Sequence, residues 1–380
     1  MRASTLLWNN ENRWTPSSNE VPENPTLILY FGATDVLSES TEPLQQLVDR
    51  FPSAQICGCS SAGEICDESV YDNTIIALVL EFETTTVRIA QALIEDSSDS
   101  YFVGRALARE LSGESFKHVF LLSDGLNING TPLAAGFNEH LPDGVQLTGG
   151  LAGDGARFQK TLTGIGADLQ SKRLVAIGFY GEDLEVAIGS CGGWGAFGPK
   201  RLVTASTNNV LYELDGQPAL QLYKRYLGDL ADELPSSGLL FPLQVLRGDG
   251  TPNLVRTLLA VNETDQSMTF AGDIPLNSRV SLMKASFDAI VDGAEVAAGQ
   301  ARNSSVAKEH KASLLVSCVG RKLLLGQRID EEVEAVTNIL GPETVISGFY
   351  SYGELAPRSG FTACNLHNQT MTLTTIWETN

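Results

Sequence analysis

The chain has 380 residues, of which 43% are hydrophobic and 19% are charged, a composition typical of a globular protein with a substantial core. Its formal charge of -20 arises from 46 acidic and 26 basic residues without any basic run, so the surface repels phosphate backbones and anionic lipid. The sequence therefore argues against nucleic acid and the membrane as partners.

The lengths of the apolar segments and the spacing of the cysteines indicate where the protein is located. No apolar stretch approaches the roughly 20 residues that a bilayer requires, and the opening segment does not read as a signal peptide. The six cysteines form no CxxC pair, and several lie in apolar runs where a reduced thiol packs as a small hydrophobe. We expect a reduced, cytoplasmic protein.

The first predicted unit is a strand, a helix, a second strand and a glycine-rich turn. The apolar run PTLILYFGAT (25–34) predicts a buried strand, and STEPLQQLVDRF (40–51) predicts a helix that Ser40 or Thr41 caps. The stretch AQICGCSSAGEI (54–65) predicts a strand that ends in glycines, and a β-rich run (72–83) follows it.

Two further segments repeat this order, which is the sign of an internal repeat. The second copy is HVFLLSDGLN (118–127), TPLAAGFNEHLP (131–142) and VQLTGGLAGDG (145–155), with a β-rich run at 172–189. The third copy is ASLLVSCVGR (312–321), DEEVEAVTNILG (330–341) and ETVISGFYSYGEL (343–355), with a β-rich run at 367–378. Similar spacing in all three copies favours common structural units over chance.

Between about 200 and 310 the pattern changes to short strands and turns, which indicates an α+β insert or the front of a second domain. We place the boundary near residue 200, giving regions 26–200 and 201–380. The predicted fold is α/β, with mixed sheets built from repeated strand-helix-strand units and a ligand crevice between the two regions.

The glycine-rich strand ends are the first candidate site, because glycine lets backbone amides approach a ligand. Tight turns without a ligand are the alternative interpretation. If the turns do line a ligand site, the candidate residues are Ser60, Ser61 and Glu64 in the first, Gly150 and Asp154 in the second, and Gly348 and Glu354 in the third. The likeness of GCSSAGEI to GFYSYGEL predicts that Glu64 and Glu354 occupy comparable places in related units.

Enzymatic and nucleotide-binding motifs fit less well. A serine elbow requires G-x-S-x-G, whereas Ser60 is followed two places later by Ala62, and no sequence cue brings a base to Cys59. An amidase-like hydrolase that uses Ser60 or Cys59 remains an alternative. GWGAFG (193–198) matches G-x-G-x-x-G, but Pro199 and a strand follow it instead of a helix, so we reject a dinucleotide site.

Histidine is scarce, with four residues in the chain. His118, His140 and His310 stand at the ends of predicted elements, which favours capping or surface roles. His367 lies in LHNQT, just before a strand close to the third turn, where its ring either points into the crevice or makes a structural hydrogen bond.

Taken in order, several of these motifs resemble the FIST sensory proteins over about residues 26–378. The matching stretches are GCSSAGEI, LLSDGL, GGLAGDG, ELDGQPAL, FPL, SCVGR, GFYSYGEL and LHNQTMTLT. The resemblance implies a non-catalytic signal-input module with N-terminal and C-terminal FIST regions that binds a small ligand, such as an amino acid. No output domain is visible here, so the resemblance implies a separate partner, either a histidine kinase or a cyclic-dinucleotide signalling protein.

The chain is also similar in layout to a stand-alone bacterial branch of this family that binds haem, senses nitric oxide and controls a histidine kinase. This likeness implies haem with His367 as the first axial ligand, and Tyr350, Tyr352 and Cys364 as reserves. A haem-free receptor for an amino acid or a similar molecule is the alternative. A homo-oligomer is compatible with either hypothesis.

Overall fold

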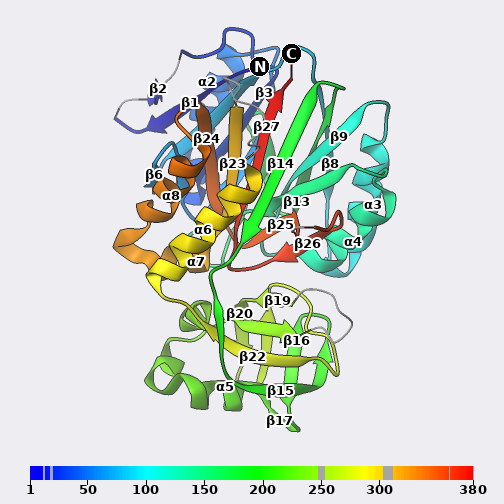
Figure 1. The fold of residues 1–380 in the computed structure, drawn as a ribbon, viewed down its shortest axis with the longest axis vertical. Coiled ribbons are helices and arrows are strands. Elements are labelled where there is room, and N and C mark those ends of the chain that lie inside the picture. The colour runs from blue at the N-terminus through cyan, green and yellow to red at the C-terminus, as the bar shows by residue number, and fades with distance from the viewer. Residues whose placement is uncertain (12, 18–19, 247–252, 303–310, 359, 380) are drawn as a thin grey trace.

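The structure is a computed structural model that describes residues 1–380 apart from 12, 18–19, 247–252, 303–310, 359 and 380. It has a larger body of three mixed sheets and a smaller module of short strands, which lies below the body in Figure 1. Both ends of the chain lie on the body, at the pole away from the module (Figure 1). The fold is α/β with mixed sheets, as the sequence predicts.

The first sheet contains the first strand-helix-strand unit. Across the sheet, its strands are β12 (Asp168–Gln170), β11 (Thr163–Ile165), β4 (Gln55–Ser61), β3 (Leu27–Ala33), β7 (Ile75–Glu81), β1 (Arg2–Asn9) and β2 (Arg13–Pro16). The parallel pair β3 and β4 is joined by α1 (Thr34–Glu39) and α2 (Glu42–Arg50). Strand β3 is buried on both faces, which is why it reads as a continuous apolar run.

The second and third sheets repeat this arrangement around the parallel pairs β9–β10 and β23–β24, so the three predicted units are confirmed. The second sheet is β26 (Cys364–His367), β25 (Gly353–Pro357), β10 (Gln146–Leu151), β9 (Phe116–Ser123), β13 (Arg173–Tyr180) and β8 (Thr86–Leu93). The third is β14 (Leu184–Cys191), β27 (Met371–Glu378), β23 (Lys311–Cys318), β24 (Thr344–Ser351), β5 (Glu64–Cys66) and β6 (Ser69–Tyr71).

After each glycine-rich turn the chain leaves its own sheet and joins another. Strand β5 from the first unit pairs with β24 of the third, β11 from the second unit pairs with β4 of the first, and β25 from the third unit pairs with β10 of the second. The exchange is cyclic, so the body has approximate three-fold symmetry in its connections. Each of the three sheets of the body contains a hairpin that belongs to another unit.

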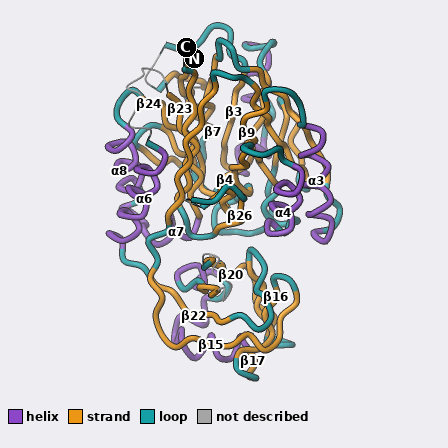
Figure 2. Tube along the Cα trace, turned by 45° about the vertical axis from the view of Figure 1, so that its right-hand side comes forward, coloured by secondary structure: helices purple, strands orange, loops and turns teal. Residues whose placement is uncertain are grey.

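Helices pack on the outer faces of the sheets, α1 and α2 on the first, and the inner faces meet in a shared core. Helices α3 (Ser100–Leu111) and α4 (Gly130–His140) pack together on one side, and α6 (Phe287–Ala301), α7 (Val319–Leu325) and α8 (Asp330–Leu340) lie on the other (Figure 2). One apolar cluster contains Phe31, Leu122 and Phe349, one from each sheet. The rings of Phe31 and Phe349 stack with centroids 4.7 Å apart.

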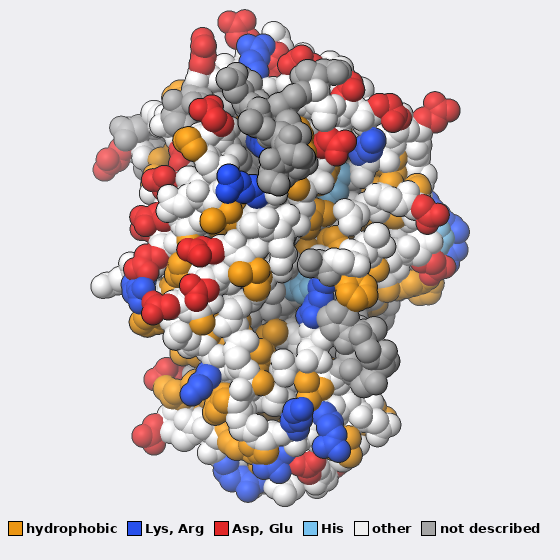
Figure 3. Space-filling model, viewed as in Figure 1, with side chains coloured by type: hydrophobic (Ala, Val, Ile, Leu, Met, Phe, Trp, Pro, Cys, Tyr) orange, Lys and Arg blue, Asp and Glu red, His pale blue; other side chains and the backbone are white. Residues whose placement is uncertain are grey.

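The smaller module is inserted between β14 and α6, within the third unit. It consists of β15 (Gly195–Thr207), β16 (Val210–Leu214), β17 (Gln217–Pro218), α5 (Ala219–Leu227), β18 (Leu243–Leu246), β19 (Leu254–Arg256), β20 (Leu258–Asn262), β21 (Ser267–Phe270) and β22 (Arg279–Lys284). It has its own apolar cluster around Val203, Tyr223 and Phe270. On the face that Figure 3 shows, acidic side chains are spread over the body and basic side chains gather at the lower end of the module.

Candidate functional site

The three glycine-rich turns come together inside the body and form a hydrogen-bonded ring. The N–H of Ala62 donates to the carbonyl of Tyr350 at 2.8 Å, and the N–H of Gly153 donates to the carbonyl of Ser60 at 3.0 Å. The N–H of Tyr352 closes the ring by donating to the carbonyl of Leu151 at 3.1 Å. The turns that the sequence singles out therefore meet, and backbone groups of the turns themselves satisfy one another at this junction.

Glu64 and Glu354 make the same set of contacts in two units, as the sequence predicts. Each carboxylate accepts from the serine three places earlier, Ser61 or Ser351, and from the N–H and hydroxyl of a threonine that precedes the next strand. Burial raises the pKa of each carboxyl to about 7, and these hydrogen bonds limit the rise. Both acids are completely buried and bonded to protein groups.

Asp154 in the second turn has a different role. Its carboxylate accepts from the backbone N–H groups of Phe158, Gln159 and Lys160, and from the hydroxyl of Tyr352. It therefore organises the loop that follows β10. Within its motif, Asp154 stands one position earlier than the two glutamates do in theirs, so the sequence already distinguishes it from them.

The glycines of the turns serve close packing between strands. A Cβ on Gly348 would lie 1.9 Å from the carbonyl oxygen of Leu315, and one on Gly150 would lie 2.5 Å from Cγ1 of Val316. Both positions therefore require glycine for reasons of space alone.

The side chains of the reserve haem ligands Tyr350, Tyr352 and Cys364 already bond to other protein groups. Tyr350 donates to Glu332 at 2.6 Å, Tyr352 donates to Asp154, and burial raises the pKa of both phenols. Cys364 is buried, and burial raises the pKa of its thiol.

Ser60 and Cys59 lack the surroundings of a nucleophile. Ser60 is completely buried, and its hydroxyl accepts from the N–H of Leu162. Burial raises the pKa of Cys59 well above its usual value. Among the hydrogen bonds of the described residues, none joins either side chain to a histidine, so the structure gives no support to the hydrolase alternative.

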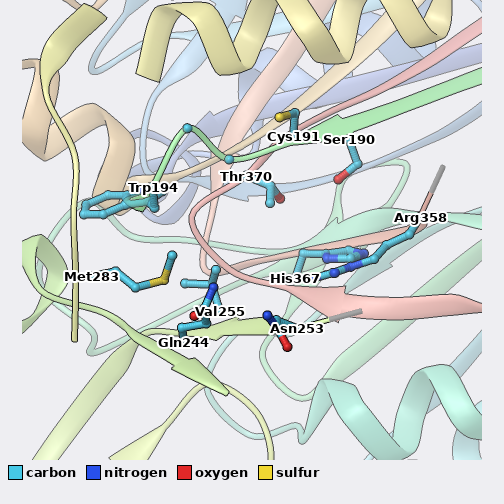
Figure 4. A pocket seen from close by; sticks show the side chains of 12 residues that line it. Ser190, Cys191, Trp194, Gln244, Asn253, Val255, Met283, Arg358, His367 and Thr370 are labelled. Atoms are coloured by element: carbon cyan, nitrogen blue, oxygen red, sulfur yellow. The ribbon is translucent and has the colours of Figure 1, made fainter. Parts of the chain in front are cut away.

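A cavity of about 530 Å³ lies where the body meets the module (Figure 4). The body contributes the end of β14 and the segment around β26, and the module contributes β18, β19 and β22. The lining residues are Ser190, Cys191, Gly192, Gly193, Trp194, Gln244, Asn253, Val255, Met283, Arg358, His367 and Thr370. Among the described residues of this lining there are one arginine and no acid, and these residues favour ligands with negative charge.

His367 is the predicted site residue that this cavity wall contains. Its Nε2 lies 3.0 Å from the carbonyl oxygen of Ala356, which fixes a neutral ring with the proton on Nε2. Burial, together with the nearby guanidinium of Arg358, lowers the pKa of His367 to about 3. Both interpretations of the sequence hold in part, since the ring makes a structural hydrogen bond and also lines a cavity.

The other histidines have structural positions. The expectation of a capping or surface role for His118 is wrong, because the side chain is buried within β9 and its Nε2 lies 2.8 Å from Oγ1 of Thr148. His140 ends α4, as predicted, and His310 lies outside the described residues. The error at His118 arises because a strand that is buried on both faces accommodates a polar residue when a partner is present.

Sequence reasoning missed most of the cavity. Arg358 follows the third turn by only a few residues, and Trp194 lies in the GWGAFG segment that fails as a nucleotide motif. The signal that could have found Trp194 is the pair Gly192 and Gly193 before it. Gly193 has φ +90, and a Cβ there would lie 2.0 Å from the carbonyl oxygen of Ala289.

Neither a membrane-spanning helix nor a metal-binding cluster occurs among the described residues. No helix in this part of the chain combines the length and apolar character needed to cross a bilayer. No group of three His, Cys, Asp or Glu side chains among these residues is arranged to hold a metal ion.

Comparison with protein families gives two adjoining matches. The family model described as FIST N domain matches residues 26–217, which is more than half of the chain, and the model described as FIST C domain matches residues 219–357. The two matches meet inside the smaller module, at the start of α5. No curated protein matches the chain.

Proposed function

Because the chain belongs to the FIST family of signal-transduction sensory domains, we propose that it is a non-catalytic sensor that binds a small ligand in the cavity between the body and the module. The observation that carries this proposal is the composition of the cavity wall. Body residues such as His367 and Thr370 face module residues such as Val255 and Met283 across one space. A ligand that contacts both parts favours the arrangement that brings them together, which is how a binding event becomes a signal.

For the ligand we favour a haem-free receptor that takes an amino acid or a similar small molecule. Arg358 lies beside His367 at one end of the cavity, and the module side combines the apolar Val255 and Met283 with the polar Gln244 and Asn253 (Figure 4). A small molecule that combines charged or polar groups with an apolar part matches this distribution.

Haem with nitric oxide as the signal is the second candidate, supported by the neutral ring of His367 in the cavity wall. The fit is limited, because the Nε2–H of this ring is bonded to Ala356 and only Nδ1 remains as a donor to iron. Tyr350 and Cys364 are buried and bonded elsewhere. We therefore attribute no step of signalling to haem.

The partner that we propose is a separate histidine kinase or cyclic-dinucleotide signalling protein. Ligand binding at the junction would change the position of the module relative to the body, and the partner would recognise one of the two positions. The acidic surface of the body favours a partner with a basic contact face.

Two measurements test the proposal. A thermal-shift screen of amino acids and related compounds should find ligands that raise the melting temperature by an amount set by concentration over Kd. Val255→Trp, which fills the cavity, should abolish this rise, whereas Val296→Trp on the exposed face of α6 should retain it. A rise that survives Val255→Trp would place the ligand elsewhere and refute the proposal.

Haem is tested separately by an absorption spectrum after expression with haem supplied. If haem is the cofactor, His367→Ala should shift or remove the Soret band. His118→Ala is the matched control, because His118 is also buried and neutral but does not line the cavity. A colourless protein, or the same spectrum in both variants, would remove His367 as an iron ligand.

A further inference from the structure

The segment Gly192 to Trp194 joins β14 to the module and lines the cavity with its backbone. In the described part of the chain, no protein group accepts a hydrogen bond from the backbone N–H of Gly192, Gly193 or Trp194. The indole Nε1–H of Trp194 is buried and also lacks a protein acceptor. Four donors without a protein acceptor are thus gathered on three consecutive residues beside a cavity.

Arg321, on the core side of this segment, fixes the orientation of its backbone. The guanidinium of Arg321 is completely buried and donates to the carbonyl oxygen of Gly192. In a trans peptide the C=O and the following N–H point in opposite directions. The N–H of Gly193 therefore points away from Arg321, out of the core.

Arg321 is itself held by groups on two helices. It donates to both Glu332, at 2.7 and 2.9 Å, and the carbonyl oxygen of Ile290, at 2.9 Å. Glu332 also accepts from Tyr350 and Ser317, so all members of the network are fixed. The positive charge at the Gly192 carbonyl polarises the peptide and makes the N–H of Gly193 a stronger donor.

We infer that Gly192, Gly193 and Trp194 form a subsite for a carboxylate group, and that Arg321 is its positioning residue. The inference rests on the proposed function and specifies which end of the ligand is recognised by the segment. The described residues of the lining include no acid, so a negative charge on the segment meets no repulsion from them, and the described cation, Arg358, lies at the other end of the cavity. The carboxylate would lie on the segment, with the rest of the ligand toward Val255 and Met283.

The test uses sodium propionate as the probe and propionamide, a neutral molecule of nearly the same shape, as its control. Amide and indole N–H resonances of the full-length protein are followed by NMR during titration. Propionate should shift the N–H signals of Gly193 and Trp194 in a saturable way, and propionamide at the same concentration should not. Equal shifts with both probes, or none with propionate, would overturn the subsite.

Two variants separate recognition from general stability. Trp194→Phe should weaken propionate binding about tenfold, the effect of losing one hydrogen bond to a charged group. Trp8→Phe is the matched control, since its indole N–H is also buried without a partner but is remote from this cavity. Arg321→Lys keeps the charge but not the fork that reaches Glu332 and Gly192 together, so the preference for propionate over propionamide should fall. If Arg321→Lys leaves this preference unchanged, its assignment as a positioning residue is wrong.

The methyl signals of Val255 and Met283 distinguish this inference from the proposed function. A ligand that shifts these methyl signals but leaves the Gly193 and Trp194 N–H signals unchanged would overturn the carboxylate subsite and support the cavity as a binding site. If no compound of the screen shifts the methyl signals, both the proposed function and the inference that rests on it are wrong.

Discussion

Replacing Glu354 with Gln should make the stability of the protein less dependent on pH. Burial raises the pKa of this carboxyl from 4.5 to about 7, against the lowering effect of the hydrogen bonds from Ser351 and Thr370. Between these two values the folded protein retains a proton that the unfolded chain has released, so stability falls as pH rises through this window and levels off above it. From pH 5 to pH 8 the wild type should lose about 2.5 kcal/mol through this one group.

The Gln side chain fits the same contacts. Its amide oxygen can accept from the N–H of Thr370, and its NH₂ group can donate to the hydroxyl oxygen of Ser351. The variant therefore removes the titration and retains the hydrogen bonds. Glu64→Gln should behave in the same way, because Glu64 has equivalent partners and a pKa of about 7.

The assay is urea unfolding followed by circular dichroism at pH 5, 6, 7 and 8. The free energy of unfolding of Glu354→Gln should fall by about 2.5 kcal/mol less than that of the wild type over this range, and the double variant should double the difference. Glu343→Gln at an exposed position is the control and should follow the wild type. If Glu354→Gln shows the wild-type slope, the carboxyl is ionised throughout and the reasoning from burial fails.

Three further predictions concern stability. Arg321→Met should cost about 3–5 kcal/mol in urea unfolding because it leaves Glu332 buried without its cation, and adding Glu332→Leu should recover part of the loss; equal stability of the single and double variants would contradict this. Gly348→Ala should prevent folding because its Cβ would lie 1.9 Å from a carbonyl oxygen of β23, whereas Gly299→Ala, in open space on α6, should raise the melting temperature. Burial alone would raise the pKa of Glu378, but hydrogen bonds from the N–H groups of residues 83–85 lower it to about 2. Glu378→Gln should therefore destabilise the protein above pH 4.5 and have little effect near pH 2. Urea unfolding at both pH values will test this.

The sequence predicts the units well because each is local. The apolar runs and helix periods of α2, α4 and α8 depend on neighbours within a dozen residues, and α8 ends before Gly341. Short α1 is missed because six residues are too few for a periodic pattern. The exchange of β5, β11 and β25 between sheets is also missed, since an alternating strand does not specify which distant strand it will pair with.

The site is predicted less completely, for a physical reason. The motif likeness correctly places Glu64 and Glu354 in equivalent positions, but it does not distinguish residues that bind a ligand from residues that join one unit to the next. Buried hydroxyl and carboxyl groups satisfy each other in both situations. The cavity wall depends on Trp194, Val255 and Arg358, which the fold brings together from three separate segments.

The cyclic exchange of hairpins also governs the order in which the chain can complete its fold during synthesis. Strand β5 leaves the ribosome early, but its partner β24 is made only after most of the chain. Until then one edge of the Glu64–Cys66 strand is open. The backbone groups of Ala62 and Gly63, just before Glu64, also lack their hydrogen bonds to Tyr350. A nascent chain with this topology carries a β5–β6 hairpin with one unpaired edge for most of its translation, and such an edge is a template for pairing with another chain.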